Sequence, residues 1–335
     1  MFKSPRFWNA KDSLLVRAFS PLSKAYSFFN AINYNKTIPV PATVPVLCVG
    51  NIVMGGAGKT PTVELVCDIL KNDGLVPHIL SSGYGGYLKN VVKVDPELHS
   101  YLQVGDEALL SARVAPTWVG KNRINSSRAA TISGANVLVL DDGFQNNSLI
   151  QDLKILVVDS GQEFGNEKIF PAGPLRVSVE SGLRKSDVVL VIGDKSTALE
   201  TKIQQINPNT VICNAKMKVV NEEEFAGQQV IGFCGLGYPG KFYKTLKEIG
   251  FDIKDFIAFS DHHPYTITEA QKLIKAARNA GAKLVTTMKD YIKIPDVFKH
   301  ELLVINIKLQ LEGDTLTEII RSTIGRRTAG PTHGK

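Results

Sequence analysis

A glycine-rich loop between a predicted strand and a predicted helix is the feature that most restricts how this chain can fold. Residues 44–49 are mostly apolar, the loop Gly50-Asn-Ile-Val-Met-Gly-Gly-Ala-Gly58 follows, and Lys59-Thr60-Pro61 begins a helical pattern that extends to residue 71. Strand, glycine loop and helix in this order are typical of a phosphate-binding loop, in which backbone N–H groups face phosphate oxygens. Proline is compatible with the first helical turn, because it loses no helical hydrogen bond there. The sequence therefore predicts a nucleotide-binding α/β protein.

The loop supplies backbone donors, one cation and one hydroxyl. Lys59 can reach the outer phosphates of ATP as a point charge, and the Thr60 hydroxyl can bind Mg²⁺. The strict pattern has a glycine where Val53 stands, so the loop is a variant, and a glycine-rich turn that binds nothing is the alternative. The residues expected to contact ATP are Gly55, Gly56, Ala57, Gly58, Lys59, Thr60 and Pro61.

Apolar runs and helical patterns alternate along the chain. The runs at residues 76–80, 117–119, 137–140, 155–158 and 188–192 are continuously apolar, which indicates a parallel sheet covered on both faces. Residues 216–229 are polar without a clear apolar period, and the alternation then restarts. We therefore predict a doubly wound P-loop core over 36–218 and a smaller α/β domain over 219–315. An amphipathic segment, 1–35, precedes them, and a C-terminal helix and basic tail, 316–335, follow.

The net charge of +7 is concentrated at the two ends of the chain. Residues 1–35 carry +4 and residues 321–335 carry another +4, which leaves the long middle part at −1. A nearly neutral body argues against a nucleic-acid-binding surface spread over the fold. Nothing in the sequence indicates an obligatory protein partner.

The N-terminal segment combines aromatic residues with spaced cations. Asp12, Arg17, Lys24 and two prolines interrupt every apolar run that is long enough to span a bilayer. The cations are distributed along the segment rather than gathered before an apolar core, so a cleaved signal is not indicated. A basic amphipathic helix in the interface of anionic lipids fits this pattern. The alternative is a helix that packs on the protein's own core.

Two adjacent carboxylates follow the apolar run at 137–140. Asp141 and Asp142 stand at the carboxyl end of that predicted strand, the edge where open α/β sheets bind ligands. Beside a phosphate-binding loop, such a pair commonly holds Mg²⁺. The simpler interpretation is a capped turn after a strand.

Several other polar groups permit both a functional and a structural interpretation. Asp106 and Glu107 open a predicted helix, and capping alone explains them. The run Asp261-His262-His263 either provides a proton acceptor or ends a strand. Arg123 and Arg176 either clamp a phosphate or form surface ion pairs.

The motifs taken together resemble one family. GN-x₄-G-x-GKTP, SGYGG, VGDE, DDGFQ, GN-x₄-PAGPLR and DHH occur in this order over residues 45–290, as in the tetraacyldisaccharide 4′-kinases of lipid A biosynthesis. The resemblance implies transfer of the γ-phosphate of ATP to the 4′-hydroxyl of an acylated glucosamine disaccharide 1-phosphate. It also implies a peripheral enzyme at the cytoplasmic face of the bacterial inner membrane, docked on anionic lipids through its N-terminus.

The resemblance also implies roles for individual residues. Asp106 matches the family's catalytic base, with His262 assisting and Glu107 supporting the site. Arg123 and Arg176 match phosphate-handling arginines, Lys59 binds ATP phosphates, and the Mg²⁺ ligands are Thr60, Asp141 and Asp142. The sequence does not distinguish His262 from His263.

The chain departs from the family pattern at two positions. Ser82 stands where the family usually has arginine, and Asn146 stands where DDGFQ is usually followed by histidine. Both changes remove a cationic or titratable group, which affects the expected substrate affinity more than the reaction class. The competing hypothesis is a membrane-docked P-loop ATPase or regulator that phosphorylates no small molecule.

Overall fold

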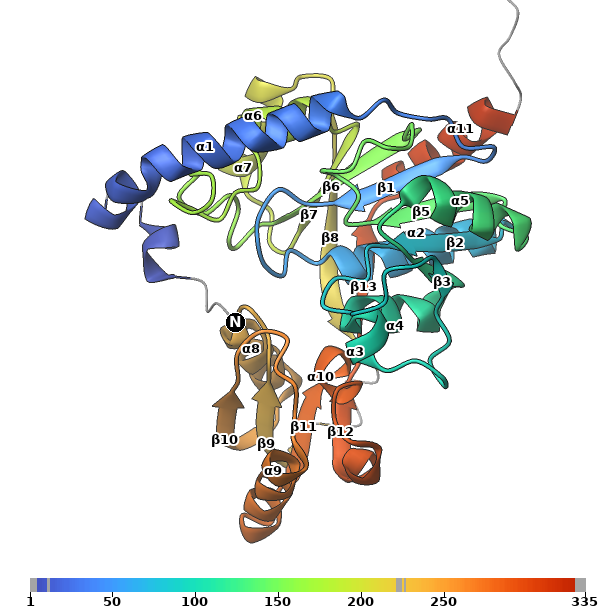
Figure 1. Cartoon of the computed structure of the whole chain (residues 1–335). Coiled ribbons are helices and arrows are strands. Elements are labelled where there is room, and N and C mark those ends of the chain that lie inside the picture. Colours follow the sequence, from blue (N-terminus) through green and yellow to red (C-terminus); the bar gives the residue numbers. More distant parts are fainter. Residues whose placement is uncertain (1–4, 11–12, 221–224, 226, 329–335) are drawn as a thin grey trace, which may run out of the picture. The chain divides into compact units, whose positions relative to one another are not determined.

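The chain forms two compact units, each built around its own sheet (Figure 1). The computed structural model describes residues 5–10, 13–220, 225 and 227–328. Lys218–Lys308 make up the smaller unit, and Pro5–Met217 together with the chain from Leu309 onward make up the larger one. The chain thus leaves the larger unit once and returns to it.

Within the described residues, nine strands form the sheet of the larger unit, in the order β13-β8-β7-β6-β1-β5-β2-β4-β3. The pairs from β8 through β1 to β4 are parallel, and β3 pairs with β4 in antiparallel fashion. The strands are β1 (Val46–Gly50), β2 (Pro77–Ser81), β3 (Val92–Lys93), β4 (Thr117–Val119), β5 (Val137–Asp141), β6 (Leu153–Asp159), β7 (Val188–Ile192), β8 (Val211–Val219) and β13 (Ile307–Glu312).

Helices cover both faces of this sheet, which confirms the predicted α/β class with a mostly parallel sheet. Alternate residues of β1 belong to different cores: Leu47 packs with α2 and α11, and Cys48 packs with α5, α6 and α7. The helices of this unit are η1 (Arg6–Asn9), α1 (Leu14–Lys36), α2 (Lys59–Asn72), α3 (Tyr101–Val104), α4 (Asp106–Val114), α5 (Arg123–Ile132), α6 (Val179–Arg184), α7 (Thr197–Ile206) and α11 (Thr315–Thr328).

Strand β8 differs from the sequence expectation. It covers residues 211–219, although 216–219 looked like polar linker. Its residues 211–215 pair with β7, and β8 lies next to the edge strand β13, so that several of its side chains face solvent. Helix α11 inserts Leu316 and Ile320 into the core beneath α2. The rest of the predicted basic tail, 329–335, lies outside the described residues.

The smaller unit is an α/β unit with a parallel sheet, whose strands lie in the order β10-β9-β11-β12. Two apolar cores, one on each face, stabilise it; Phe242 and Leu246 belong to one, and Leu273 and Ile274 to the other. Its elements are β9 (Gln229–Cys234), α8 (Pro239–Ile249), β10 (Asp252–Ala258), α9 (Ile267–Asn279), β11 (Lys283–Thr287), α10 (Met288–Tyr291), η3 (Asp296–Glu301) and β12 (Leu302–Ile305).

The sheet order of the larger unit brings the two predicted nucleotide motifs together. Strands β1 and β5 are parallel neighbours, with Val49 opposite Asp141. The glycine loop follows β1 and the acidic pair ends β5, so both motifs lie at the same carboxyl edge. The chain also changes direction here, because β5 and β2 lie on one side of β1 while β6 to β8 lie on the other. Ligands of doubly wound sheets bind at such a point.

Candidate active site

The glycine loop opens α2 in a conformation that only glycine adopts easily. Gly58 precedes the helix with φ +90°, and Gly55 has φ +123°. A Cβ on Gly58 would approach Ile192 Cδ1 to 2.6 Å, so a side chain there would also displace the end of Ile192. The Thr62 hydroxyl donates to the Gly58 carbonyl over 2.8 Å and fixes the first turn. The N-terminal N–H groups of α2 therefore remain available to an anion.

Val53, the residue that breaks the strict phosphate-loop pattern, has a structural purpose. It forms an antiparallel bridge with Leu175, and Met54 N donates to the Pro174 carbonyl over 2.7 Å. The side chain of Val53 is buried in the core that also contains Leu175. The loop is therefore paired along its backbone with the segment 165–176, and this pairing brings Arg176 to the glycine loop.

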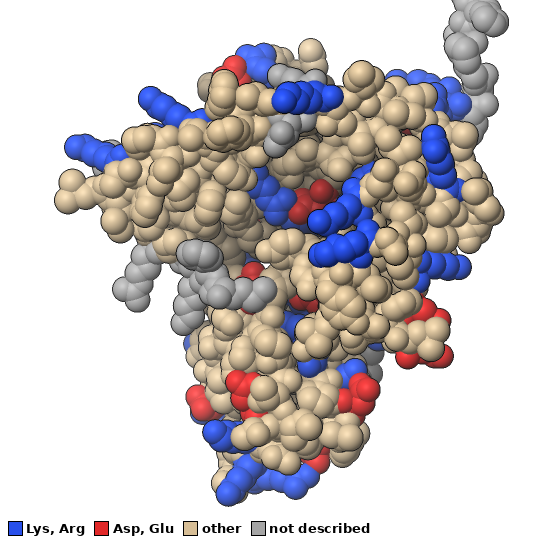
Figure 2. Space-filling view, viewed as in Figure 1, with Lys and Arg blue, Asp and Glu red and all other residues tan. Residues whose placement is uncertain are grey.

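Lys59 and Arg176 converge on one carboxylate oxygen. Lys59 Nζ lies 3.4 Å from Asp142 Oδ2, and Arg176 Nη1 donates to the same oxygen over 2.7 Å. Burial favours protonation of Asp142, but the two cations outweigh it and hold the pKa of this carboxyl below its ordinary value. Asp142 in turn raises the pKa of Arg176 despite the burial of that guanidinium. Figure 2 shows acidic atoms in a hollow of the larger unit with basic side chains around them.

Asp141 is buried beside this pair with its charge poorly compensated. Neither of its carboxylate oxygens has a hydrogen-bond partner among the described residues, and the same is true of Asp142 Oδ1. Burial, followed by the nearby charges of Glu107 and Asp142, raises the pKa of Asp141 to about 7. Three unsatisfied carboxylate oxygens at the edge of a phosphate loop fit a hard divalent cation, which prefers oxygen ligands.

Arg123 lies behind the acidic pair. It is the first residue of α5, is 4% exposed, and donates from Nη2 to the Asp141 carbonyl over 3.4 Å. Burial lowers the pKa of its guanidinium, and Asp141 and Asp142 oppose that effect. Its Nη1 has no hydrogen-bond partner among the described residues. A buried guanidinium with an unused donor is suited to an additional anionic group.

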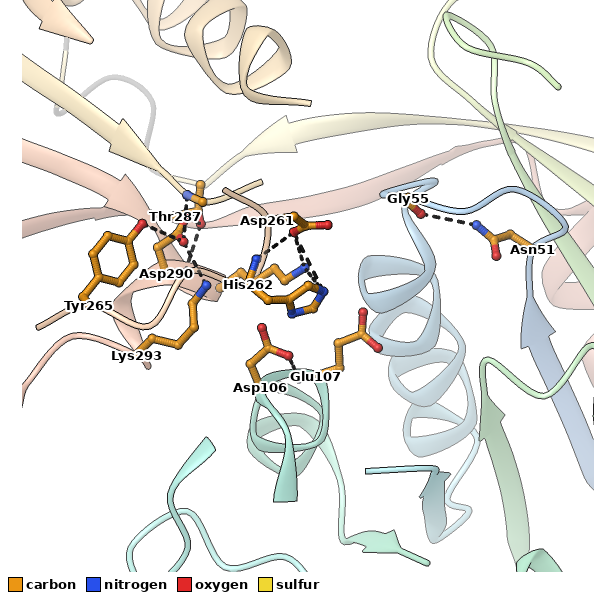
Figure 3. Close-up of polar contacts among 12 residues, drawn as sticks. Asn51, Gly55, Asp106, Glu107, Asp261, His262, Tyr265, Thr287, Asp290 and Lys293 are labelled. Atoms are coloured by element: carbon orange, nitrogen blue, oxygen red, sulfur yellow. Dashed lines mark hydrogen bonds and ion pairs between the residues drawn. The ribbon is translucent and has the colours of Figure 1, made fainter. Parts of the chain in front are cut away.

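Asp106 and Glu107 begin α4 and are held by glycines of the segment 82–86. Gly105 has φ +89°, and a Cβ there would collide with the Tyr84 carbonyl oxygen. Two of the sequence motifs, SGYGG and VGDE, therefore pack backbone against backbone. The Asp106 carboxylate is 5% exposed and accepts from Glu107 N over 2.9 Å (Figure 3). The packing of the glycines fixes where this carboxylate lies.

The smaller unit contains the Asp261-His262 pair at the carboxyl end of β10, where Lys289 meets it. Lys289 Nζ lies 3.3 Å from Asp261 Oδ1 and 3.2 Å from His262 Nε2. Because an ammonium group only donates, Nε2 accepts, and the neutral imidazole carries its proton on Nδ1. His262 has φ +56°, and its backbone N–H donates to the Gly235 carbonyl and to the Asp261 carboxylate.

The neighbouring His263 has a different environment. Its ring stacks on Phe259 with centroids 4.6 Å apart, and its Nε2 lies 3.2 Å from Glu269 Oε1. Glu269 also accepts from Thr266 in the capping box of α9. These contacts incorporate His263 into an aromatic cluster at the start of a helix. His262, in contrast, lies beside the ion pair of Asp261 and Lys289.

A buried aspartate that the sequence interpretation missed supports the His262 turn. Asp290 is fully buried and receives hydrogen bonds from Gly235 N, Tyr265 Oη and Thr287 Oγ1 (Figure 3). Lys293 Nζ lies 3.1 Å from it and is also buried. Burial, and then the charge of Asp290, raise the pKa of Tyr265. The only sequence signal was a run of polar residues directly after the apolar residues of β11.

Helix α1 packs on the segment that carries Arg176. The Ser23 hydroxyl donates to the Ile169 carbonyl over 2.7 Å and accepts from Ala172 N, and Trp8 Nε1 donates to the Pro171 carbonyl. Tyr26 contacts Phe170 with ring centroids 5.5 Å apart. The other side of α1 exposes large apolar side chains to solvent: Leu14, Leu15, Leu22, Phe28 and Phe29.

Helix α1 therefore packs on the protein's own core, as one interpretation of the amphipathic segment expects, and also exposes apolar residues to solvent. It contains Arg17, Lys24 and Lys36 and no acidic residue. Lys3 and Lys11 of the predicted basic set lie outside the described residues. Among the described residues, no helix combines the length and the apolar character that a membrane span requires.

The structure thus places the predicted site residues in two groups. Lys59, Thr60, Arg123, Asp141, Asp142 and Arg176 lie at one edge of the large sheet, with Asp106 and Glu107 on a helix of the same unit. His262 belongs to the smaller unit. Of the two unusual residues, Ser82 is exposed, and Asn146 accepts from Ser148 N and Ser148 Oγ within a turn. Asn146 therefore has a local structural use.

Comparison with known sequences shows which proteins share these features. The sequence model of the family described as Tetraacyldisaccharide-1-P 4'-kinase matches residues 14–325. A tetraacyldisaccharide 4′-kinase of Rhodopseudomonas palustris (strain HaA2) is 40% identical over 294 residues, 87% of each chain. One of Rhodospirillum rubrum is 37% identical over 328 residues, 97% of this chain and 99% of that protein.

Comparison with solved structures agrees with the sequence matches. A crystal structure of LpxK from Aquifex aeolicus, described as an "apo" form in complex with ATP, superposes with a TM-score of 0.71. The superposition covers 93% of this chain and 100% of that one, at 25% sequence identity.

Proposed function

The chain belongs to the tetraacyldisaccharide 4′-kinase family, and on this basis we propose which residues carry out its reaction. The activity is that of a lipid A kinase: a phosphoryl group passes from ATP to the 4′-hydroxyl of a tetraacyldisaccharide 1-phosphate. The observation that carries the proposed site is the convergence of Lys59 and Arg176 on Asp142, at the strand end next to the glycine loop.

ATP is proposed to bind to the glycine loop. The N–H groups of Gly55, Gly56, Ala57 and Gly58 and the first turn of α2 would face its phosphates, with Lys59 as the cation of the loop. Arg176 and Arg123 add two guanidinium groups at the same edge, and each can stabilise negative charge on the transferred phosphoryl group. Most of the rate would come from positioning and charge, because phosphoryl transfer needs little covalent participation from the protein.

Asp141, Asp142 and the Thr60 hydroxyl are proposed to hold Mg²⁺. The unsatisfied carboxylate oxygens of Asp141 and Asp142 are the observation that supports this assignment. When bound, the ion would neutralise phosphate charge. The Asp142 oxygen that faces Lys59 and Arg176 keeps both cations oriented toward the same site.

Asp106 is proposed as the general base. Its carboxylate would accept the proton of the 4′-hydroxyl as that oxygen bonds to the γ-phosphorus and the bond to the departing ADP oxygen breaks. His262 would assist through its Nδ1–H, since Lys289 engages its Nε2. Glu107 would support the same site, because its charge acts on both Asp141 and Arg176.

Helix α1 is proposed to dock the enzyme on anionic lipids at the cytoplasmic face of the bacterial inner membrane. The exposed Leu22, Phe28 and Phe29 would enter the lipid interface while Arg17 and Lys24 meet lipid phosphates. The opposite face of α1 contacts the segment 165–176, which leads directly to Arg176. A helix on the lipid surface would thus hold an active-site arginine near the acylated substrate.

The test is transfer of label from γ-labelled ATP to a tetraacyldisaccharide 1-phosphate in detergent micelles. We expect Lys59→Ala to lower turnover at least ~10²-fold, because it removes a charge that acts on the transferred group. Lys71→Ala is the matched control, since Lys71 lies on the same helix and donates to the Val114 carbonyl. Native-like transfer by Lys59→Ala would contradict the proposed site. ATP hydrolysis without labelled lipid would favour a membrane-docked ATPase instead.

A further inference from the structure

Beneath the glycine loop, hydrogen bonds and an ion pair close a ring of five residues. Asn51 Oδ1 lies 3.4 Å from Lys59 Nζ, and that ammonium lies 3.4 Å from Asp142 Oδ2. Asp142 Oδ2 accepts from Arg176 Nη1 over 2.7 Å, and the same Nη1 donates to Gln145 Oε1 over 3.3 Å. Gln145 Nε2 then donates to the Asn51 carbonyl over 2.9 Å, which closes the ring.

We propose that Gln145 is a positioning residue for phosphoryl transfer, which aims Arg176 and fixes Asn51 beneath the glycine loop. The proposal rests on the roles proposed above for Lys59 and Arg176. Gln145 is not proposed to contact a phosphate itself. It acts on the reaction through the two neighbours that it holds.

The ring needs a side chain at position 145 that both accepts and donates, and a carboxamide does both. A guanidinium only donates and a backbone carbonyl only accepts, so the residue between Arg176 and Asn51 must accept on one side and donate on the other. The two partners also decide how the amide is oriented, with Oε1 toward Arg176 and Nε2 toward Asn51. A carboxylate would lose the donor, and an apolar side chain would lose both groups.

The Gln145 side chain contacts two residues at the proposed phosphate site, Arg176 at its oxygen and Asn51 at its nitrogen. Arg176 Nη1 has two acceptors, and loss of Gln145 would leave Asp142 as the only one of these two that orients it. Asn51 is fully buried, and its side chain contacts Lys59 Nζ and the Gly55 carbonyl. Small displacements of charged groups at a reacting centre lower turnover by up to ~10²-fold. Loss of Gln145 is therefore expected to lower kcat by more than its effect on stability explains.

Gln151 provides a matched control in the same turn. Its Nε2 donates to the carbonyls of Gly143, over 3.3 Å, and Asn146, over 2.7 Å. Neither bond involves a member of the ring. Gln151→Leu thus removes two hydrogen bonds from the turn that contains Gln145 while it preserves the contacts of Arg176 and Asn51.

The experiment measures kcat, KM for ATP and melting temperature for Gln145→Leu, Gln151→Leu, Arg176→Ala and the double variant Gln145→Leu/Arg176→Ala. We expect Gln145→Leu to lower kcat ~10-fold or more, whereas Gln151→Leu changes kcat less than ~2-fold at an equal or larger loss of melting temperature. The double variant should be slower than Arg176→Ala by much less than the full loss seen in Gln145→Leu, because the part of that loss that acts through Arg176 is already gone.

Two results would overturn the inference. One is equal kcat for the two leucine variants, which would show that position 145 only stabilises the turn. The other is multiplication of the two losses in the double variant, which would show that Gln145 does not act through Arg176. If Lys59→Ala and Arg176→Ala both keep native turnover, the proposed function of the site fails. If those variants are slow and Gln145→Leu is not, the positioning role alone fails.

Discussion

Asp106 is the residue for which the structural and the functional interpretation make the most clearly different predictions. Its carboxylate accepts from Glu107 N at the start of α4, a contact that any helix start can use. An asparagine side chain keeps such an acceptor but cannot take up a proton at neutral pH. Asparagine and alanine at this position therefore separate the two roles.

We expect Asp106→Asn and Asp106→Ala to lower kcat equally, by at least ~10²-fold, because both remove the general base. Asp106→Asn should keep a melting temperature near that of the native chain. Label transfer to the disaccharide and a thermal melt measure the two quantities. Full activity of Asp106→Asn beside a slow Asp106→Ala would reduce Asp106 to a structural residue.

The buried carboxyl group of Asp141 makes the stability of the folded chain depend on pH. Burial raises the pKa of this carboxyl to about 7 in the folded chain, from an ordinary value of 3.8. Between these values the folded state keeps a proton that the unfolded state has lost. Stability of the metal-free protein should therefore fall as pH rises through this window and level off above it.

Asp141→Asn removes the ionisable group and hence this slope. The free energy of unfolding of the native chain should fall between about pH 5 and about pH 8, and that of the variant should not show this fall. Over this range the difference between the two chains should change by at least ~1 kcal/mol in favour of the variant. Urea melts in the presence of a chelator measure the gain, and the same substitution should abolish kinase activity. Parallel stability curves for the two chains would contradict the poor charge compensation of Asp141.

The sequence indicated the first set of candidate site residues and missed the residues that contact them. Lys59, Asp141 and Asp142 are recognisable because they follow apolar runs in a known order of chemical groups. Asn51, Gln145 and Lys289 carry no such signal, since their value depends on contacts with residues 8, 31 and 27 positions away. Only the sheet order and the turns bring these partners together.

At the scale of elements, α1 shows how one helix serves two environments. Its inner face is fixed to the segment 165–176, and its outer face exposes Phe28 and Phe29, which are 63% and 64% accessible to solvent. Exposed aromatic residues beside Arg17 and Lys24 match what an anionic lipid interface binds. The two faces can be changed independently.

We expect Phe28→Ser/Phe29→Ser to weaken binding to anionic liposomes at least ~10-fold, because two buried rings would be lost from the lipid interface. Sedimentation with liposomes measures binding, and activity on a short-chain substrate analogue should change little. Ile132→Ser is the control, since Ile132 is 88% exposed on another helix. Equal binding of both proteins would locate the membrane contact elsewhere.

Most elements of the core could be predicted because their side chains are buried on both faces. β1, β5 and β7 are buried throughout, and apart from Asp141 at the end of β5 they contain no polar side chain, so such runs are visible without a partner. β8 and β13 are partly exposed, and their residues alternate with polar ones. Whether such a segment is a strand depends on an edge position that only the complete sheet reveals.

At the scale of the whole molecule, the smaller unit is an insertion between two neighbouring strands. The chain enters it after β8 and leaves it into β13, which lies beside β8 in the large sheet. Val220 N donates to the Asn306 carbonyl over 2.9 Å, so the outgoing and returning segments are paired where they meet. Each unit has its own apolar cores.

We expect a chain in which a two-residue Asn-Gly turn joins Val220 directly to Asn306 to fold cooperatively. Its melting temperature should rise with ATP, because the glycine loop is intact and ligand binding stabilises the folded state. Transfer to the disaccharide should be absent, since His262 is lost. A chain without a cooperative transition would show that the large unit depends on the insertion.

The interrupted connectivity also imposes an order on biosynthesis. β13 and α11 supply Leu309, Leu316 and Ile320 to one of the two cores of the large sheet, yet the ribosome makes them after the entire smaller unit. The inserted unit is therefore complete while the earlier unit still lacks an edge strand and a covering helix. Until then, the apolar face beneath α2 and the hydrogen-bonding edge of β8 are open, so nascent chains that stall there are candidates for chaperone capture.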